Sequence, residues 1–114
     1  MTIIFAVIAK GKKRKMAESI IQKDKTKCFI CGQNACGDPL DKHHVFGAAC
    51  RNKSEKYGLT VYIHHFKCHI FGENAVHRNA KVNRKLQAFV QKKAMNHYKW
   101  SEDDFRKLFY KNYI

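Results

Sequence analysis

Acidic residues are scarce in this chain of 114 residues, which has 9 Asp and Glu against 23 Lys and Arg. The resulting formal net charge of +14 attracts polyanions, and nucleic acid is the commonest polyanion that selects for such a charge. An acidic membrane surface is the competing partner. The basic residues, however, are spread along the whole chain and do not form one amphipathic basic helix. We therefore expect nucleic acid, and no membrane, as the partner.

The sequence also lacks an apolar run long enough to cross a bilayer. The N-terminal run, residues 3–9, is too short for a membrane span, and it lacks the basic region and the cleavage pattern of a secretory signal. We expect a strand or a weakly anchored extension there. Five basic residues follow within 10–15, where a weak membrane or nucleic-acid contact is an alternative. We expect a cytoplasmic protein.

No internal repeat and no Pro/Gly-rich linker divides the chain, which contains one proline and six glycines. The basic run at 10–15 is the one biased tract. A chain of this length forms one domain with a modest core, which a bound metal would help to stabilise. We expect a basic N-terminal extension over residues 1–27 and one domain over residues 28–114 with a C-terminal helical segment.

Local patterns predict an α+β domain. Residues 16–25 suit a short helix, residues 28–40 are rich in turns, and residues 40–47 and 59–63 are typical of strands. An apolar stripe at helical spacing follows from about residue 73, formed by Val82, Leu86, Phe89, Val90 and Ala94. Ser101 resembles the N-cap of a last helix, whose buried face would be Phe105, Leu108 and Phe109.

The cysteines indicate zinc binding in a reducing compartment. Five is an odd number, and Cys28-x-x-Cys31 has the spacing of zinc ligands rather than of a disulfide framework. His65-x-x-Cys68 is a second pair at ligand spacing, so a Cys3His structural zinc site is expected. Cys36 or His64 could replace His65 as the fourth ligand. Cys50 has no partner at ligand spacing and is expected to be a small buried residue.

His43 and His44 are consecutive and follow Asp41 by two and three positions. On a strand, consecutive side chains point to opposite sides. One histidine can therefore hold a cation while the other faces a substrate phosphate. A His-His pair is by itself common, and a purely structural role is its usual meaning. The nearby cysteine and histidine pairs, with His69 and His77 downstream, favour a second metal site.

Together these motifs resemble the HNH endonucleases. The match covers about residues 28–80 and rests on Asp41-x-His43-His44-Val45, on Cys68-His69 and on the two zinc pairs. The resemblance implies a small zinc-stapled ββα-metal domain with C-terminal helices that cleaves double- or single-stranded DNA. Residues 47–59 and 75–79 also look like small phage-encoded members, including RecA-dependent recombination-enhancement nucleases. That narrower resemblance adds a recombinase as a partner.

The resemblance also implies roles for individual residues. His44 would be the general base, Asp41 would orient a histidine, and Arg51 would clamp a phosphate. The ligands of one catalytic Mg²⁺ or Mn²⁺ ion would be His43, His77 and His69.

Two features depart from the family pattern. The family's middle asparagine has no clear counterpart, and Ser54 or Glu55 could take its place. His69 and His77 are eight residues apart and cannot lie one helical turn apart, so a loop around Gly72 must bring His77 back. Of the two, we expect His77 to be the ligand carried by the helix, and His69 could instead serve the zinc or the strand–helix junction.

Two other functions fit the same sequence. A non-catalytic zinc-finger-like module could bind DNA or RNA and use His43 and His44 only structurally. A small phage protein could use the same fold to bind a host protein.

Overall fold

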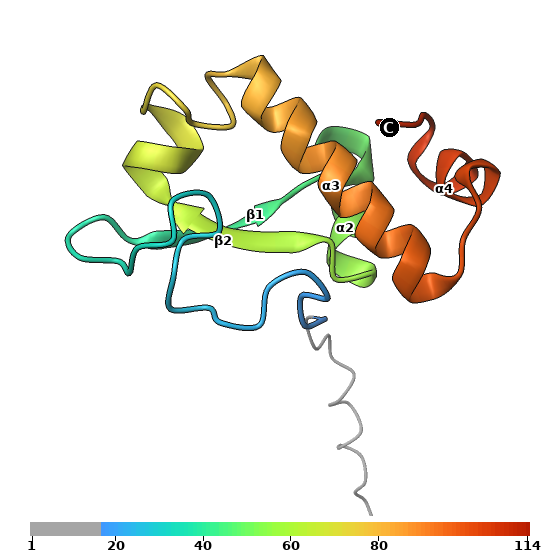
Figure 1. The fold of residues 1–114 in the computed structure, drawn as a ribbon, viewed down its shortest axis with the longest axis horizontal. Coiled ribbons are helices and arrows are strands. Elements are labelled where there is room, and N and C mark those ends of the chain that lie inside the picture. The colour runs from blue at the N-terminus through green and yellow to red at the C-terminus, as the bar shows by residue number, and fades with distance from the viewer. Residues whose placement is uncertain (1–16) are drawn as a thin grey trace, which may run out of the picture.

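The structure is a computed structural model and describes residues 17–114, so the predictions for residues 3–9 and 10–15 lie outside the described range. In chain order the elements are β1 (Leu40–His44), η1 (Ala48–Cys50), α2 (Arg51–Lys56), β2 (Thr60–His64), the π-helix η2 (His65–Ile70), α3 (Ala80–Tyr98) and α4 (Glu102–Phe109). This is a small α+β arrangement with one two-stranded sheet (Figure 1). Among residues 17–114, no helix is both long and apolar enough for a membrane span.

The sheet pairs β1 with β2 in an antiparallel register. Leu40 lies opposite His64, and His43 lies opposite Val61. The predicted strand at 40–47 is thus shorter in the structure, because pairing stops at His44, and η1 and α2 occupy the connection to β2. Strand β2 is buried at Val61 and Ile63 and lies at the centre of the molecule.

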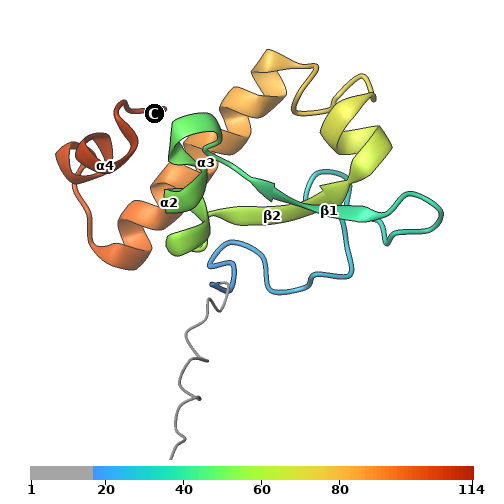
Figure 2. The same cartoon turned by 180° about the vertical axis from the view of Figure 1, so that it is seen from behind.

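Helix α3 crosses the sheet, and α4 folds back beside its C-terminal half (Figures 1 and 2). The predicted apolar stripe is buried at Leu86, Val90 and Ala94. Phe89 departs from it: this residue is 44% exposed, and its ring centroid lies 5.9 Å from that of Phe29.

The last helix begins as predicted. The Ser101 hydroxyl accepts a hydrogen bond from the Asp104 amide, and the Asp104 carboxylate accepts one from the Ser101 amide. This reciprocal cap satisfies two amides that have no partner within the helix. Phe105 and Phe109 are buried against Phe46, with ring centroids 5.3 and 5.1 Å away.

The helix predicted over residues 16–25 is wrong for its described part, residues 17–25, which form bends and turns. Their amides bond to the Ser19 side chain and to the Gly58 carbonyl instead, and two of their side chains bond to β2. The Ser19 hydroxyl accepts from the Ile21 and Gln22 amides and donates to the Thr60 carbonyl. The Gln22 side chain accepts from the Tyr62 amide. Contacts with a distant strand therefore replace the local helical bonds.

Candidate metal centres

Four side chains from three segments form the first cluster. They are Cys28, Cys31, His64 and Cys68, and their ligand atoms lie within 4.8 Å of one another. The cluster could hold a metal ion such as zinc. Cys28 and Cys31 come from the turn before β1, whereas His64 ends β2 and Cys68 lies in η2. His64 takes the place that we expected for His65, and Cys36 is exposed and outside the cluster.

The contacts of the two ring nitrogens of His64 leave one of them free to bind a metal ion. Its Nε2 lies 2.6 Å from the Asn34 carbonyl oxygen, which can only accept, so Nε2 carries the proton. The lone pair is then on Nδ1, which lies 3.3 Å from the Cys31 sulfur. His65 is one residue further on, where the chain has left β2, and its ring bonds to Asp41 instead.

The thiols of this cluster influence one another strongly. Burial raises the pKa of Cys28, but backbone amides nearby outweigh burial and bring it to about 7. Burial, together with the neighbouring Cys28, raises the pKa of Cys68 to about 12. A cation among the sulfurs relieves this repulsion, since a coordinating thiol is deprotonated.

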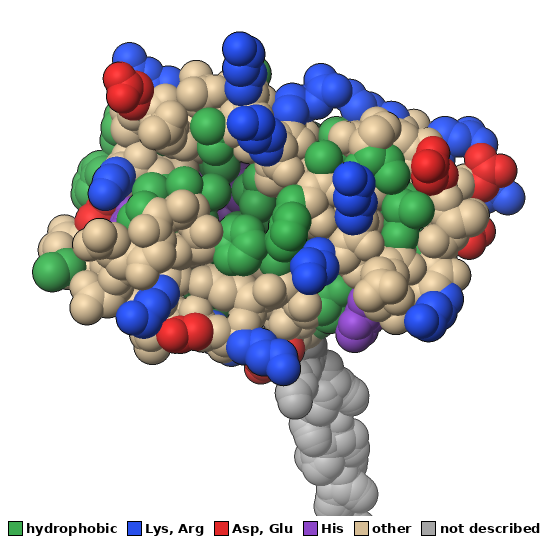
Figure 3. Space-filling model, in the orientation of Figure 1, with side chains coloured by type: hydrophobic (Ala, Val, Ile, Leu, Met, Phe, Trp, Pro, Cys, Tyr) green, Lys and Arg blue, Asp and Glu red, His purple; other side chains and the backbone are tan. Residues whose placement is uncertain are grey.

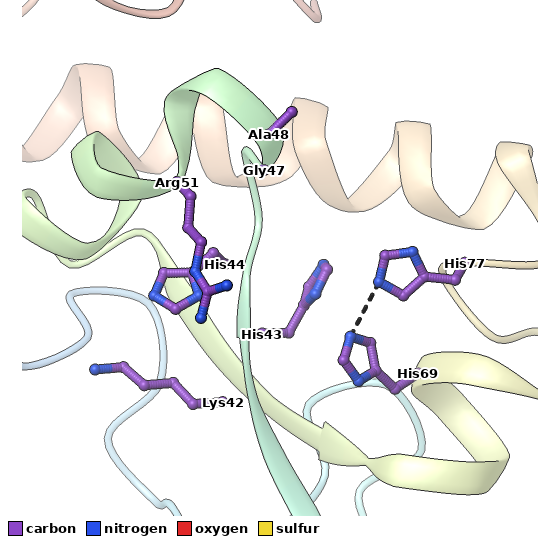
Figure 4. Close-up of a pocket in the computed structure, with 8 residues that line it drawn as sticks. All are labelled: Lys42, His43, His44, Gly47, Ala48, Arg51, His69 and His77. Atoms are coloured by element: carbon purple, nitrogen blue, oxygen red, sulfur yellow. Dashed lines mark hydrogen bonds between the residues drawn. The ribbon is translucent and has the colours of Figure 1, made fainter.

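The second cluster contains the three histidines that we expected to hold a catalytic ion. His43 comes from β1, His69 from η2, and His77 from the turn before α3. One ring nitrogen of each lies within 4.8 Å of the others, and His69 Nε2 is 3.1 Å from His77 Nε2 (Figure 4). His69 and His77, whose roles the sequence left open, therefore both belong to the cluster. Our expectation of a helix-borne His77 is wrong, since α3 begins only at Ala80.

Asp41 orients His69 within this cluster. Its Oδ2 accepts hydrogen bonds from Nδ1 of His69 at 2.8 Å and from Nδ1 of His65 at 2.6 Å. Burial raises the pKa of Asp41, but these bonds outweigh it, so the pKa is lowered and the carboxylate is ionised. An ionised carboxylate can only accept, so His69 carries its proton on Nδ1 and directs the Nε2 lone pair at His77.

His43 has the clearest character of a ligand. It is 7% exposed, and its Nε2 is buried without a hydrogen-bond partner among the described residues. Burial, with His69 and His77 nearby, lowers the pKa of His43 to about 3. Burial and His69 likewise lower the pKa of His77. Both imidazoles are therefore neutral near pH 7, the state in which a ring nitrogen binds a metal.

We predict that Asp41→Ala weakens divalent-ion binding at the histidine cluster by about 10- to 100-fold, because the ring of His69 loses the partner that orients it. Calorimetric titration with Mn²⁺ measures the change. Asp103→Ala is the control, since Asp103 is exposed on α4 and bonds to Arg106. Equal Mn²⁺ affinity in the Asp41 variant and the wild type would contradict the orienting role.

His44 points to the other side of β1 from His43, as strand geometry requires, yet both border one hollow of about 260 Å³ (Figure 4). Arg51, at the start of α2, borders the same hollow, as do His69 and His77. The hollow thus brings together a group suited to proton transfer, a guanidinium and the candidate ion site.

Glu55 is a partner of His44, a contact that the sequence did not predict. Its Oε1 lies 2.8 Å from His44 Nε2, and its Oε2 accepts from the Lys42 ammonium at 2.9 Å. Burial raises the pKa of Glu55, but these bonds outweigh it, so the pKa is lowered and the carboxylate is ionised. His44 therefore donates from Nε2, and its Nδ1 has the lone pair when the ring is neutral.

Ser54 braces the loop that follows β1. Its buried hydroxyl accepts from the Phe46 amide at 3.0 Å and donates to the Phe46 carbonyl at 2.7 Å. These bonds join the end of β1 to α2. Cys50 is buried, as expected, with its sulfur 3.6 Å from the Phe109 carbonyl oxygen.

Comparison with known proteins gave no match among family models, curated proteins or solved structures.

Proposed function

We propose that this protein is a metal-dependent endonuclease of the HNH type that hydrolyses phosphodiester bonds in DNA. One observation carries the proposal: the histidine cluster, His44 and Arg51 border the same hollow. A purely structural role for the two histidines does not account for a buried ring nitrogen of His43 that has no partner within residues 17–114.

His43, His69 and His77 would hold the divalent ion, Mg²⁺ or Mn²⁺. When bound, this ion supplies stabilisation of the negative charge that develops on the phosphate and on the departing oxygen. His44 takes a proton from the attacking water at Nδ1, while Glu55 holds the Nε2 proton and the orientation of the ring. The guanidinium of Arg51 matches two phosphate oxygens and positions the strand.

We propose zinc as the ion of the Cys28, Cys31, His64 and Cys68 cluster. Three thiolates and one imidazole form a closed tetrahedral set with no position left for water, as in structural zinc sites. The site would join the N-terminal turn to the end of β2 and to η2. Because η2 also carries His69, the zinc would stabilise the segment that positions a catalytic-ion ligand.

The proposed DNA partner fits the surface. Lys and Arg side chains are spread over the face seen in Figure 3, with exposed hydrophobic side chains between them.

We predict that DNA affinity falls steeply as salt rises, since each neutralised phosphate releases condensed counterions. Arg51→Ala should reduce the slope of log K against log salt by about 1, measured by fluorescence anisotropy. Lys107→Ala, on α4, is the control. An unchanged slope in the Arg51 variant would contradict the phosphate contact.

The experiment that tests the function is cleavage of supercoiled, linear and single-stranded DNA by purified protein. Cleavage should require Mg²⁺ or Mn²⁺ and stop when EDTA is added. A parallel reaction with RecA-coated DNA tests whether a recombinase is a partner. Protein that binds each DNA but cuts none with any divalent ion would refute the nuclease and favour the zinc-finger-like binding module.

A further inference from the structure

Two phenylalanines stand on the surface beside the histidine cluster. Phe66 lies in η2 and Phe71 directly follows it, and they are 51% and 58% exposed. Their ring centroids are 5.8 Å apart, and the ring planes differ by 18°. Two near-parallel aromatic rings in water lose the benefit of burial, so such a pair points to a ligand that covers it.

The backbone that carries these rings is held in place. The Asp38 carboxylate accepts from the amides of Phe66 and Lys67, both at 2.9 Å. The Phe66 carbonyl accepts from the Phe71 amide at 2.8 Å, and the Phe71 carbonyl accepts from the Arg78 guanidinium at 2.8 Å. The rings are therefore exposed on an ordered support, which lowers the entropic cost of binding.

The same segment connects the rings to the proposed active site. The Phe66 ring meets the edge of His65, with centroids 4.6 Å apart. His65 and His69 share the Asp41 carboxylate, and the His77 amide donates to the His69 carbonyl. A ligand on the two rings therefore lies next to the histidine cluster.

We propose that Phe66 and Phe71 form a stacking platform for unpaired nucleobases, so that the enzyme acts on single-stranded or locally unpaired DNA. The proposal rests on DNA being the substrate, as argued above. Every base presents a flat apolar face, which is free to stack on protein only when it has left the duplex stack. Lys67 follows Phe66 in the chain, and the Arg78 guanidinium donates to the Phe71 carbonyl, so both supply positive charge for the adjoining phosphates. This combination of flat rings and cations matches a nucleic-acid strand better than an apolar protein surface.

Equilibrium binding without added divalent ion tests the platform independently of cleavage. Three labelled DNAs of equal length are compared by anisotropy: a single strand, the same strand with abasic sites, and a duplex. Stacking contributes about 1–3 kcal/mol per base, so the wild type should bind the normal strand about 5- to 150-fold more tightly than the abasic strand. Phe66→Leu with Phe71→Leu should remove that preference and leave duplex affinity unchanged.

Two variants serve as controls. Phe66→Tyr with Phe71→Tyr keeps flat rings and should retain the preference. Phe89→Leu changes another exposed phenylalanine, with the Lys93 ammonium 5.4 Å from its ring centroid, and should also retain it. A wild type that binds normal and abasic strands equally, or a double leucine variant that keeps the preference, would overturn the platform. Sedimentation showing that the two leucines act only by abolishing self-association would also overturn the platform.

The outcomes also separate this inference from the nuclease proposal. Base-dependent binding without cleavage under any ion supports the platform and refutes the nuclease. Cleavage by a protein that binds normal and abasic strands equally supports the nuclease and refutes the platform.

Discussion

Replacing His44 with alanine is expected to lower divalent-ion-dependent DNA cleavage by about 10²–10⁴-fold, the usual effect of losing a general base. The side chain borders the hollow that also contains the histidine cluster. Its Nε2 bonds to Glu55, which leaves Nδ1 to take the proton. DNA binding should change little, because one imidazole contributes little to the attraction of a polyanion to a chain of charge +14.

The measurement is the single-turnover cleavage rate, taken with circular dichroism and DNA affinity of the same variant. His97→Ala is the matched control, since His97 is exposed on α3 and outside both clusters. It should cut at the wild-type rate. Wild-type cleavage by the His44 variant would show that another group takes the proton, and a joint loss of folding and DNA binding would show a structural role.

Cys28→Ser is expected to abolish metal retention in the first cluster and to unfold most of the protein. Cys28 is 2% exposed, and its cluster joins the turn before β1, the end of β2 and η2. Structural zinc contributes about 10–16 kcal/mol in zinc-finger peptides, as much as the whole stability of an ordinary domain, about 5–15 kcal/mol. In a chain with so modest a core, the remaining contacts would not offset that loss.

Metal analysis of the wild type should give close to one zinc per chain, and thermal unfolding should show the loss in the variant. Cys36→Ser is the control, since Cys36 is exposed and outside the cluster. His64→Ala should lose zinc while His65→Ala keeps it, which tests the fourth ligand directly. Well-folded wild-type protein without zinc would contradict the structural role of the site.

The sequence alone predicted those features of the protein whose geometry depends on a few neighbouring residues. Cys28 and Cys31 meet because two intervening residues form one turn. His43 and His44 face opposite sides because side chains alternate along a strand. The cap at Ser101 involves four consecutive residues and is present as predicted. Each of these features depends on the backbone conformation of a few neighbouring residues, which local residue types largely determine.

Only the tertiary structure decided the features that depend on where distant segments meet. The spacing to Cys68 favours His65, but β2 ends at His64, so the His64 ring faces the cysteines and the His65 ring faces Asp41. The pairing of His44 with Glu55 spans eleven residues and depends on how α2 packs beside β1. Residues 17–25 form no helix because β2 bonds to the side chains of Ser19 and Gln22 and holds the segment against the strand. In each case the free energy that stabilises the observed arrangement comes from contacts between distant segments, which a local sequence pattern does not predict.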